Sequence, residues 1–540
     1  MSGSTHRALR MDDILQCIFE SSSSMQRKDD LNSRKNLARV ARTCKAFSRY
    51  ALPQLWRSLP SVNPLLSLLA PLRLARTDEQ WLQSGCYEAN NPPERNRGYS
   101  WVFDGTITPA NVSRFQEYAA FVHALNIRRF PQLDPTIFSC VGHVGSLRGA
   151  LLPALEVLDC ETSQSMYQTV RLVMGPSLRS FACNLRASPV YLAEHAESDT
   201  GKAHMLETLL SDLHFSSPHL ETLMLSAFML WWDLRPALAF TELRTLDLSK
   251  YVSSKFGTDF WQSLAMVPHL HTLRLPTTVI GELAPFPGGF ARLEDLHVTG
   301  STHDITRILR FIAPSRLRVL SISGTFDYPR CAHEVLEPVC DRCSNTLTEV
   351  RVECAGGSFR DPVSGLMDVL QPFVPARRIR IVVLQFHDGA FSFTGADLCA
   401  LTQYWPALHI FELANGSDRV EAMTAPPSLQ AIVDFAHACP DLEEVSLPKI
   451  AWPLASAPGD EEQYTCRPNN LRVVRTDCIG FGAGKGREEI AADRRMAGRI
   501  LYRLFPALDV QRSREVYGSV HPIFLGRFWL DAIEELQKGQ

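Results

Sequence analysis

Hydrophobic residues recur along the chain in a short motif, in which a leucine is followed three and five residues later by two further aliphatic residues. The motif is clearest in the segments 220–225, 243–248, 270–275, 293–298 and 317–322. Its last two aliphatic positions alternate with polar residues, which is typical of a strand with one buried face. We therefore expect a β-strand in each segment.

Further copies extend the motif over most of the chain. Later copies lie at 347–352, 408–413 and 442–447, and weaker ones at 155–158, 178–181 and 471–474. The segment 122–127 is a candidate first copy, and 379–386 is an irregular one.

The stretches between these strands have helical spacing. Apolar residues fall at i, i+3 and i+4 in 259–266, 306–312 and 429–438. Proline follows many of these stretches, and it ends a helix because its nitrogen cannot donate the intrahelical hydrogen bond. The prolines concerned are Pro218, Pro268, Pro314, Pro406, Pro440 and Pro506.

The spacing of the motif predicts a repeat array. Successive starts at residues 220, 243, 270, 293 and 317 lie 23 to 27 residues apart, within the range of about 20–29 residues for leucine-rich repeats. A chain of 540 residues is too long for one compact core, whereas an array adds units without thickening its core. We expect an α/β fold, a leucine-rich-repeat solenoid of parallel strands with outer helices. The asparagine that usually occupies the turn of such a repeat is missing from this chain. The alternative is an ordinary α/β domain in which the leucine spacing arises by chance.

A different pattern precedes the repeats. The segment 11–20 predicts a short amphipathic helix with one apolar side. A polar stretch, 21–35, predicts a loop. The segments 36–44 and 45–59 predict two more short helices, the second interrupted near Pro53.

These helices resemble an F-box. The family pattern runs Ile-Leu-x-x-Ile-Phe, then a Leu-x-x-Val-x-x-x-Cys helix, then a segment that ends in Leu-Trp. The chain matches it over residues 9–60, and the matching positions are Ile14, Leu15, Ile18, Phe19, Leu37, Val40, Cys44, Leu55 and Trp56. Two departures are Arg10-Met11, in place of the usual Leu-Pro, and a longer loop at 21–35.

The resemblance implies a role for the N-terminal segment. F-box proteins bind the Skp adaptor of a cullin–RING ubiquitin ligase through these helices, and their C-terminal repeats hold the target protein. The implied partner-binding residues are Ile14, Leu15, Ile18, Phe19, Leu37, Val40, Cys44 and Trp56. Alternatively, the segment is only a helical cap on the array, because terminal repeats need capping.

Three regions follow from these patterns. We expect an F-box-like helical domain at 9–60, a linker or capping region at 61–111, and the repeat solenoid at 112–540. The stretch 83–96 is polar and contains two prolines, which is typical of an exposed loop.

Charge and cysteine content exclude several classes of protein. The formal net charge is −3 and the sequence shows no block of lysine and arginine, so we expect no nucleic-acid partner. No secretory signal and no apolar run long enough to span a bilayer is apparent. We therefore expect an intracellular protein, cytoplasmic or nuclear, that binds no membrane, with reduced cysteines that mostly pack in the core.

Candidate chemistry is sparse. The glycine-rich segment 480–486 lacks the spacing of a phosphate loop. Cys340 and Cys343 form a single pair where structural zinc usually needs two, so buried thiols are favoured. His269 and His271 alternate in an expected strand and share a face, and Trp231-Trp232 is either a packed pair or a binding hot spot. We expect no metal and no cofactor.

The function that these features favour is that of a substrate-recognition adaptor subunit in an SCF-type (Skp–cullin–F-box) ubiquitin ligase. It would be non-catalytic and would bind an unknown target protein through its repeats. A leucine-rich-repeat scaffold or receptor unconnected with ubiquitin is the alternative. No catalytic motif is present. A cysteine and a histidine could still meet in space by chance, so a hydrolase or a nucleotide-dependent enzyme is a third alternative.

Overall fold

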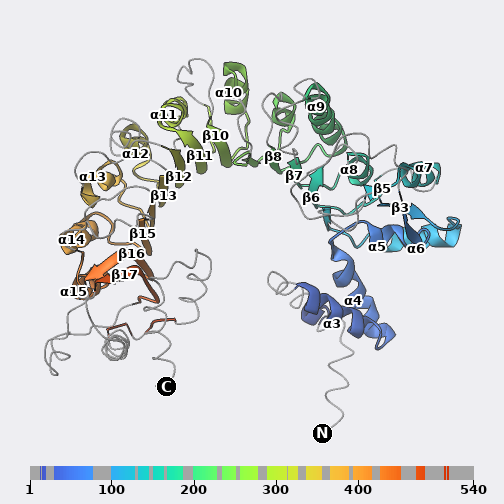
Figure 1. Cartoon of the computed structure of the whole chain (residues 1–540), viewed down its shortest axis with the longest axis horizontal. Coiled ribbons are helices and arrows are strands. Elements are labelled where there is room, and N and C mark those ends of the chain that lie inside the picture. Colours follow the sequence, from blue (N-terminus) through green and yellow to red (C-terminus); the bar gives the residue numbers. More distant parts are fainter. Residues whose placement is uncertain are drawn as a thin grey trace, which may run out of the picture. The chain divides into compact units, whose positions relative to one another are not determined.

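The chain divides into two compact units, Met1–Ser254 and Lys255–Gln540, each of which alternates strands and helices (Figure 1). The computed structural model describes residues 13, 15–19, 30–76, 99–127, 132–144, 150–162, 167–185, 199–227, 234–250, 256–277, 289–312, 314, 316–325, 336–354, 365–387, 393–415, 426–451, 470–480, 504–505 and 507–509. Neither the motif spacing nor the composition predicts the division at Ser254.

Helices form the N-terminal part of the first unit. Residues 13 and 15–19 are helical, and α3 (Asp30–Ala41) and α4 (Lys45–Arg57) follow. The loop predicted for 21–35 is wrong at its C-terminal end, because α3 begins at Asp30. Polar composition alone misled the prediction, since Leu37 on the same helix is buried in an apolar cluster and its packing holds the helix together.

The interruption predicted near Pro53 is also wrong, because α4 continues to Arg57 with Pro53 inside it. Proline removes one hydrogen bond from a helix interior. Packing on both sides of Pro53 offsets that loss: Ala51 and Leu55 contact the apolar cluster, and the Trp56 ring lies 4.7 Å from the Tyr118 ring.

The main sheet of the first unit is parallel. Its strands are hydrogen-bonded in the order β1, β4, β6, β7, β8, β9. They are β1 (Ser58–Leu59), β4 (Ala124–Ile127), β6 (Val157–Thr162), β7 (Ser180–Leu185), β8 (Thr222–Ala227) and β9 (Thr245–Asp247). The helical elements are α5 (Asn63–Leu66), α6 (Pro109–Ala119), α7 (Pro135–His143), α8 (Tyr167–Val173), α9 (Asp199–Ser216) and the 3₁₀ helix η6 (Arg235–Ala239).

A small second sheet lies beside the first repeats of this unit. It joins β2 (Leu72–Arg76), β3 (Tyr99–Phe103) and β5 (Gln132–Leu133), with β2 antiparallel to β3 and β3 parallel to β5. The region predicted as linker or cap therefore holds regular structure at both of its ends. The boundaries at residues 60 and 111 stay a prediction, and the loop predicted for 83–96 lies outside the described residues.

The second unit is a longer parallel sheet with helices along one face (Figure 1). Its strands are β10 (Thr272–Thr277), β11 (Asp295–Ser301), β12 (Val319–Thr325), β13 (Glu349–Cys354), β14 (Ile381–Phe386), β15 (Ile410–Asn415), β16 (Glu444–Ala451) and β17 (Val473–Gly480). Its helices are α10 (Thr258–Ala265), α11 (Thr302–Phe311), α12 (Glu337–Cys343), α13 (Leu366–Leu370), the 3₁₀ helix η8 (Gln371–Phe373), α14 (Gly395–Tyr404) and α15 (Leu429–Ala438).

Strand register places each aliphatic position of the motif beside the same position of the next repeat. One such row of the second unit contains Leu273, Leu296, Leu320, Val350, Val382, Phe411, Val445 and Val474. Every member of the row is at most 1% exposed. The strands predicted from the motif are confirmed, and the architecture is that of a leucine-rich-repeat array.

Short polar side chains start several of the covering helices. The hydroxyls of Ser301, Thr394 and Ser428 accept a hydrogen bond from the backbone N–H three residues later, at the starts of α11, α14 and α15. Such caps satisfy donors that the first helical turn leaves unpaired. The helices predicted in 259–266, 306–312 and 429–438 are confirmed.

Two glycines allow β11 and β12 to approach closely. Gly300 pairs with Gly324 in the register of these strands, and Gly324 has φ 144°, a conformation that L side chains rarely adopt. A Cβ atom added at Gly324 would lie 2.0 Å from the Gly300 backbone oxygen. The pair therefore excludes a side chain at position 324.

We expect Gly324→Ala to lower the free energy of unfolding by roughly 2 kcal/mol, because the added methyl group needs both a strained backbone and a shift of β11. Urea unfolding followed by circular dichroism measures the change. Gly142→Ala in α7 is the control, since a Cβ atom there meets nothing within 4 Å and alanine is the better helix former. Equal stability of the two variants would contradict the close approach.

Candidate functional site

The sheet face opposite the helices presents the side chains that alternate with the buried aliphatic rows. In the second unit, the central position of successive strands is occupied by Arg274, His297, Ser321, Arg351, Val383, Glu412 and Ser446. Arg274 and Arg351 are exposed, and only Val383 of these is buried. This face is therefore polar, whereas the opposite face is the apolar core.

Side-chain hydrogen bonds join neighbouring strands across this face. The Ser323 hydroxyl donates to Glu353 over 3.1 Å, and the Gln385 amide donates to Glu412 over 3.1 Å. The Nδ1 atom of His297 lies 2.6 Å from the Ser321 hydroxyl. Such bonds hold polar groups in fixed positions before any partner arrives, which lowers the entropic cost of binding.

One carboxyl group on this face has a raised pKa. Partial burial raises the pKa of Asp295, and the nearby carboxylates of Glu294 and Glu349 act in the same direction. A hydrogen bond that the Thr272 hydroxyl donates over 3.3 Å, together with Arg318, acts in the opposite direction. The Asp295 carboxyl group is thus already engaged by neighbouring side chains of the chain itself.

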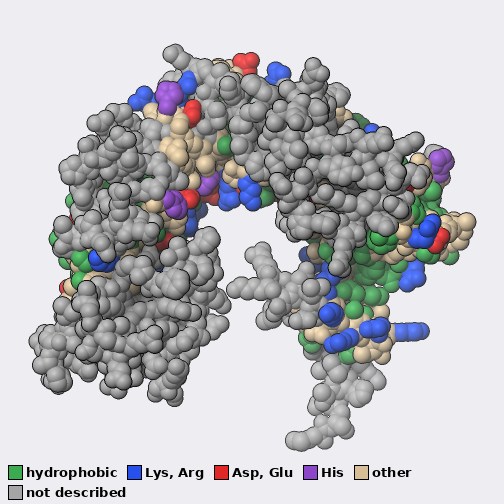
Figure 2. All heavy atoms as spheres, in the orientation of Figure 1, with side chains coloured by type: hydrophobic (Ala, Val, Ile, Leu, Met, Phe, Trp, Pro, Cys, Tyr) green, Lys and Arg blue, Asp and Glu red, His purple; other side chains and the backbone are tan. Residues whose placement is uncertain are grey.

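Charged side chains gather where the strands begin. We call the residue directly before each strand the strand-start row. For the strands of the parallel sheets, the row contains Arg57, His123, Glu156, Arg179, Glu221 and Arg244 in the first unit, and His271, Glu294, Arg318, Thr348, Arg380, His409, Glu443 and Arg472 in the second. Basic, acidic and histidine side chains are visible among the described residues in Figure 2.

Backbone hydrogen bonds fix the spacing of the strand-start row. In the second unit, the backbone N–H of each member from Glu294 to Arg472 donates to the carbonyl of the preceding member over 2.7–2.9 Å. Side chains of consecutive members therefore lie next to one another, although they are separated by a whole repeat in the sequence.

Charges alternate along much of the row. Arg244 pairs with Glu221 at 3.6 Å, Arg318 with Glu294 at 3.6 Å, and Arg472 with Glu443 at 3.9 Å. The uncharged Thr348 interrupts this alternation. The neighbours of Arg380 in the row are therefore Thr348 and His409 rather than two carboxylates.

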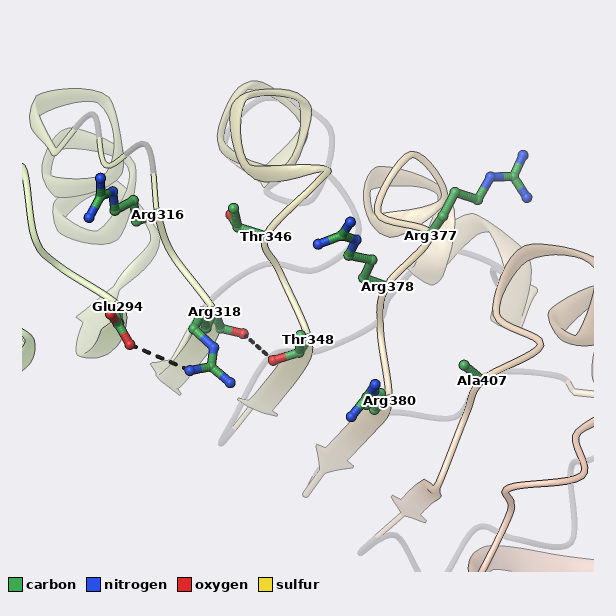
Figure 3. Close-up of a pocket in the computed structure, with 9 residues that line it drawn as sticks. All are labelled: Glu294, Arg316, Arg318, Thr346, Thr348, Arg377, Arg378, Arg380 and Ala407. Carbon is green, nitrogen blue, oxygen red and sulfur yellow. Dashed lines mark hydrogen bonds and ion pairs between the residues drawn. The ribbon is translucent and has the colours of Figure 1, made fainter.

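A groove of about 680 Å³ lies over this interruption. It follows the starts of β11 to β15 (Figure 3) and is lined by Glu294, Arg316, Arg318, Thr346, Thr348, Arg377, Arg378, Arg380 and Ala407. The fold gathers five arginines here from two short segments, 316–318 and 377–380. Aligning the repeats on their first leucine would reveal these arginines, because they then fall at matching positions of different repeats.

The N-terminal helices bury part of the predicted partner-binding set. Leu15, Phe19 and Leu37 are 2%, 7% and 5% exposed and form one cluster, with Val40 packed against it. These three side chains are therefore core residues of the segment itself. No solvent-facing role is open to them unless the cluster opens.

Other members of the set lie at the surface. Ile18 is 46% exposed, an unusual exposure for a large apolar side chain. Cys44 is exposed and its sulfur accepts a hydrogen bond from the Phe47 backbone at the start of α4. Ile14 lies outside the described residues.

Trp56 has a partner within the chain. Its ring packs against the Tyr118 ring of α6 in a tilted arrangement, with 4.7 Å between ring centroids, so it links the helical segment to the first repeats. Contact of Trp56 with another protein stays a prediction.

The buried thiols predicted for the Cys340–Cys343 pair are confirmed. Both side chains are at most 1% exposed, and burial is the main cause that raises the pKa of each thiol. The Cys343 thiol donates to the Pro314 carbonyl over 3.2 Å, just as the Cys439 thiol donates to the Trp405 carbonyl over 3.6 Å. Within the described residues no group of three or more potential ligands could hold a metal.

The remaining candidates have other positions. His269 and His271 do not lie in a strand as predicted but in the turn before β10, where His269 Nδ1 lies 2.8 Å from Arg292 and His271 Nδ1 lies 2.5 Å from the His269 carbonyl. The turn extends further than the motif suggests, because the strand pairs with β11 only from Thr272. Trp231, Trp232 and the segment 481–486 lie outside the described residues.

Among the helices that the structure describes, none is both long and apolar enough to cross a bilayer. No protein-family model and no curated protein matches the chain.

Solved structures with some similarity are larger repeat proteins. The plant peptide hormone receptor RGFR1 in complex with RGF2 shares 11% identity over 67% of this chain and 52% of its own length, with a TM-score of 0.27. TLR13 in complex with ssRNA13 shares 14% identity over 74% and 52%, with a TM-score of 0.30. The ectodomain of GASSHO1/SCHENGEN3 from Arabidopsis thaliana, in complex with CASPARIAN STRIP INTEGRITY FACTOR 2, shares 12% over 68% and 42%, with a TM-score of 0.27.

The chain thus spans about half or less of the length of these proteins. Similarity at this level carries no information about what the chain binds.

We expect the buried cysteines to resist alkylation in the folded chain. Burial raises the pKa of Cys439 to about 11, so at pH 8 its thiolate is roughly a hundredfold scarcer than that of an ordinary thiol. Mass spectrometry after brief iodoacetamide treatment should find Cys44, Cys140 and Cys399 modified and Cys340, Cys343 and Cys439 unmodified. Equal modification of both groups without denaturant would contradict the described packing.

Proposed function

We propose that the chain is a non-catalytic, intracellular substrate-recognition subunit of an SCF-type ubiquitin ligase. Its N-terminal helices would bind the Skp adaptor, and its repeats would bind the target protein. The observation that carries the proposal is Ile18, which is 46% exposed beside the buried Leu15 and Phe19, in a segment that resembles an F-box.

Physical size supports a partner at this segment. Among the residues described in the N-terminal helices, the apolar cluster has four buried members, Leu15, Phe19, Leu37 and Ala51. So few buried side chains stabilise a segment weakly. An adaptor that covered Ile18 would add apolar contact where the helices lack it.

The repeats suit the other half of the proposal. A row of polar side chains, held by hydrogen bonds between strands, lies on a sheet face that the helices leave uncovered. Arrays of this kind bind partners on extended surfaces. Holding a target there while the helices hold the adaptor would raise the effective concentration of target near the ligase.

A second candidate is a leucine-rich-repeat scaffold or receptor unconnected with ubiquitin. The contact between Trp56 and Tyr118 supports it, because a helical cap on the repeats needs such an attachment. The two candidates differ in whether an adaptor binds the surface around Ile18.

We expect the full chain to retain the Skp adaptor and the variant Ile18→Asp to lose it by at least about tenfold, since a carboxylate would have to be desolvated in an apolar contact. Co-purification of the adaptor with tagged chain, quantified by immunoblotting, measures the effect. Ile18 is a better test position than Leu15 or Phe19, whose replacement by Asp would place a charge inside the cluster and unfold the helices.

Met266→Asp is the matched control, because Met266 is 68% exposed in the second unit and undergoes the same change of chemistry. It should leave adaptor binding unchanged. Failure of the unmodified chain to retain any adaptor would exclude the ligase role and leave the scaffold candidate.

A further inference from the structure

Positive charge is uncompensated in the groove at the starts of β11 to β15. Five arginines and one carboxylate, Glu294, line it. Glu294 is already paired with Arg318, and Glu349, which directly follows Thr348, accepts from Arg351 over 2.5 Å. No carboxylate of the described residues lies within ion-pair distance of Arg316, Arg378 or Arg380.

The remaining groups of the groove have their own partners. Arg377 lies over the Tyr404 ring at 5.5 Å and donates to the Gln403 carbonyl, and it points away from Arg378 in Figure 3. The Thr346 and Thr348 hydroxyls donate to the backbone carbonyls of Leu317 and Arg318. Arg316 lies beyond Thr346 in Figure 3 and its guanidinium group points away from Arg378. The donors left for a ligand at one place are thus the guanidinium groups of Arg378 and Arg380.

We propose that this groove binds a phosphorylated serine or threonine in a segment of the target protein. The proposal deepens the target-binding half of the proposed function and rests on it. Arg378 and Arg380 would donate to the phosphate oxygens, and Arg318 would stay paired with Glu294.

The arrangement fits phosphate better than a carboxylate. Guanidinium groups donate two parallel hydrogen bonds to a phosphate, and several of them can share its three outer oxygens. A phosphate carries close to two negative charges at pH 7, whereas one carboxylate would leave most of the arginine charge unmatched. The groove volume of about 680 Å³ lies within the range of about 300–1,000 Å³ for ligand sites, so flanking residues of a peptide would fit beside the phosphate.

Two observations favour a phosphopeptide over nucleic acid. No aromatic side chain is among the described residues that line the groove, although proteins that bind single strands stack bases on aromatic rings. The chain as a whole has a formal net charge of −3, so basic charge is concentrated at this groove rather than spread along a surface.

A single substitution at Thr348 could block phosphate binding without removing any arginine. Thr348 stands in the strand-start row between Arg318 and Arg380, at the place where the alternation would require a carboxylate. In Thr348→Glu the new carboxylate would stand to Arg380 as Glu294 stands to Arg318, and it would repel a phosphate.

The test is fluorescence anisotropy of the full chain with labelled degenerate peptide pools. The central residue of the pools is phosphoserine or phosphothreonine, unmodified Ser or Thr, or Glu. We expect the phosphorylated pools to bind at least about tenfold more tightly than the unmodified ones, with Glu in between. Thr348→Glu and the double variant Arg378→Gln with Arg380→Gln should each weaken phosphopeptide binding by about tenfold or more.

Arg472→Gln, which removes a paired arginine of the same row, should change binding less than about twofold. Circular dichroism of each variant verifies that it is folded. The proposal is wrong if the phosphorylated pools bind no better than the Ser, Thr or Glu pools, if Thr348→Glu leaves binding unchanged, or if labelled oligouridine binds more tightly than any peptide.

Adaptor binding is measured in parallel with the same preparations. Ile18→Asp should leave phosphopeptide binding intact, and Thr348→Glu should leave adaptor binding intact. If the unmodified chain retains the adaptor but binds no phosphopeptide, the groove proposal is wrong. If it binds phosphopeptide but retains no adaptor, the ligase role is wrong, so the two failures are distinguishable.

Discussion

Burial of aliphatic rows across parallel strands is the interaction on which the rest of this structure depends. A single repeat exposes its two strand leucines on an edge and cannot stabilise itself, so each repeat folds only against a neighbour. The register satisfies that need, because it places Leu273 beside Leu296 and Leu320, and Leu275 beside Val298 and Ile322. All of these side chains are at most 3% exposed. Gly324 shows how tight the resulting spacing of strands is.

Stacking in register also determines how the surface is organised. Positions that are a repeat apart in sequence become neighbours, so the residue before each strand forms a line with its counterparts. Where Glu and Arg alternate in that line, as with Glu221 and Arg244, the charges neutralise each other. Thr348 breaks the alternation, and the charge of Arg380 is thereby left for a ligand. Surface function in such an array follows from the order of repeats rather than from any local motif.

The strands could be predicted from sequence because their signal is local, a fixed spacing of leucines within six residues. The helix through Pro53 and the start of α3 at Asp30 could not, since they depend on contacts between segments, such as Trp56 with Tyr118. The alternation of His269 and His271 predicts a strand, but pairing with β11 begins only at Thr272. The arginine groove could not be predicted, because Arg318 and Arg380 are far apart in the sequence and only the register of the strands brings them together.

Rigid attachment of the N-terminal helices to the first unit bears on how an adaptor subunit would work. The last residue of α4 leads directly into β1, and the Arg57 carbonyl accepts from the His123 backbone over 2.9 Å. Arg34 of α3 donates to the Ser58 carbonyl, and Trp56 packs on α6. A flexible tether would let a bound adaptor sample many orientations and would dilute its effective concentration at a target. These contacts remove that freedom, so the surface around Ile18 keeps one orientation relative to the first repeats. A partner bound there would be presented at a fixed angle to the strands of that unit, which is the property that a subunit joining two proteins requires.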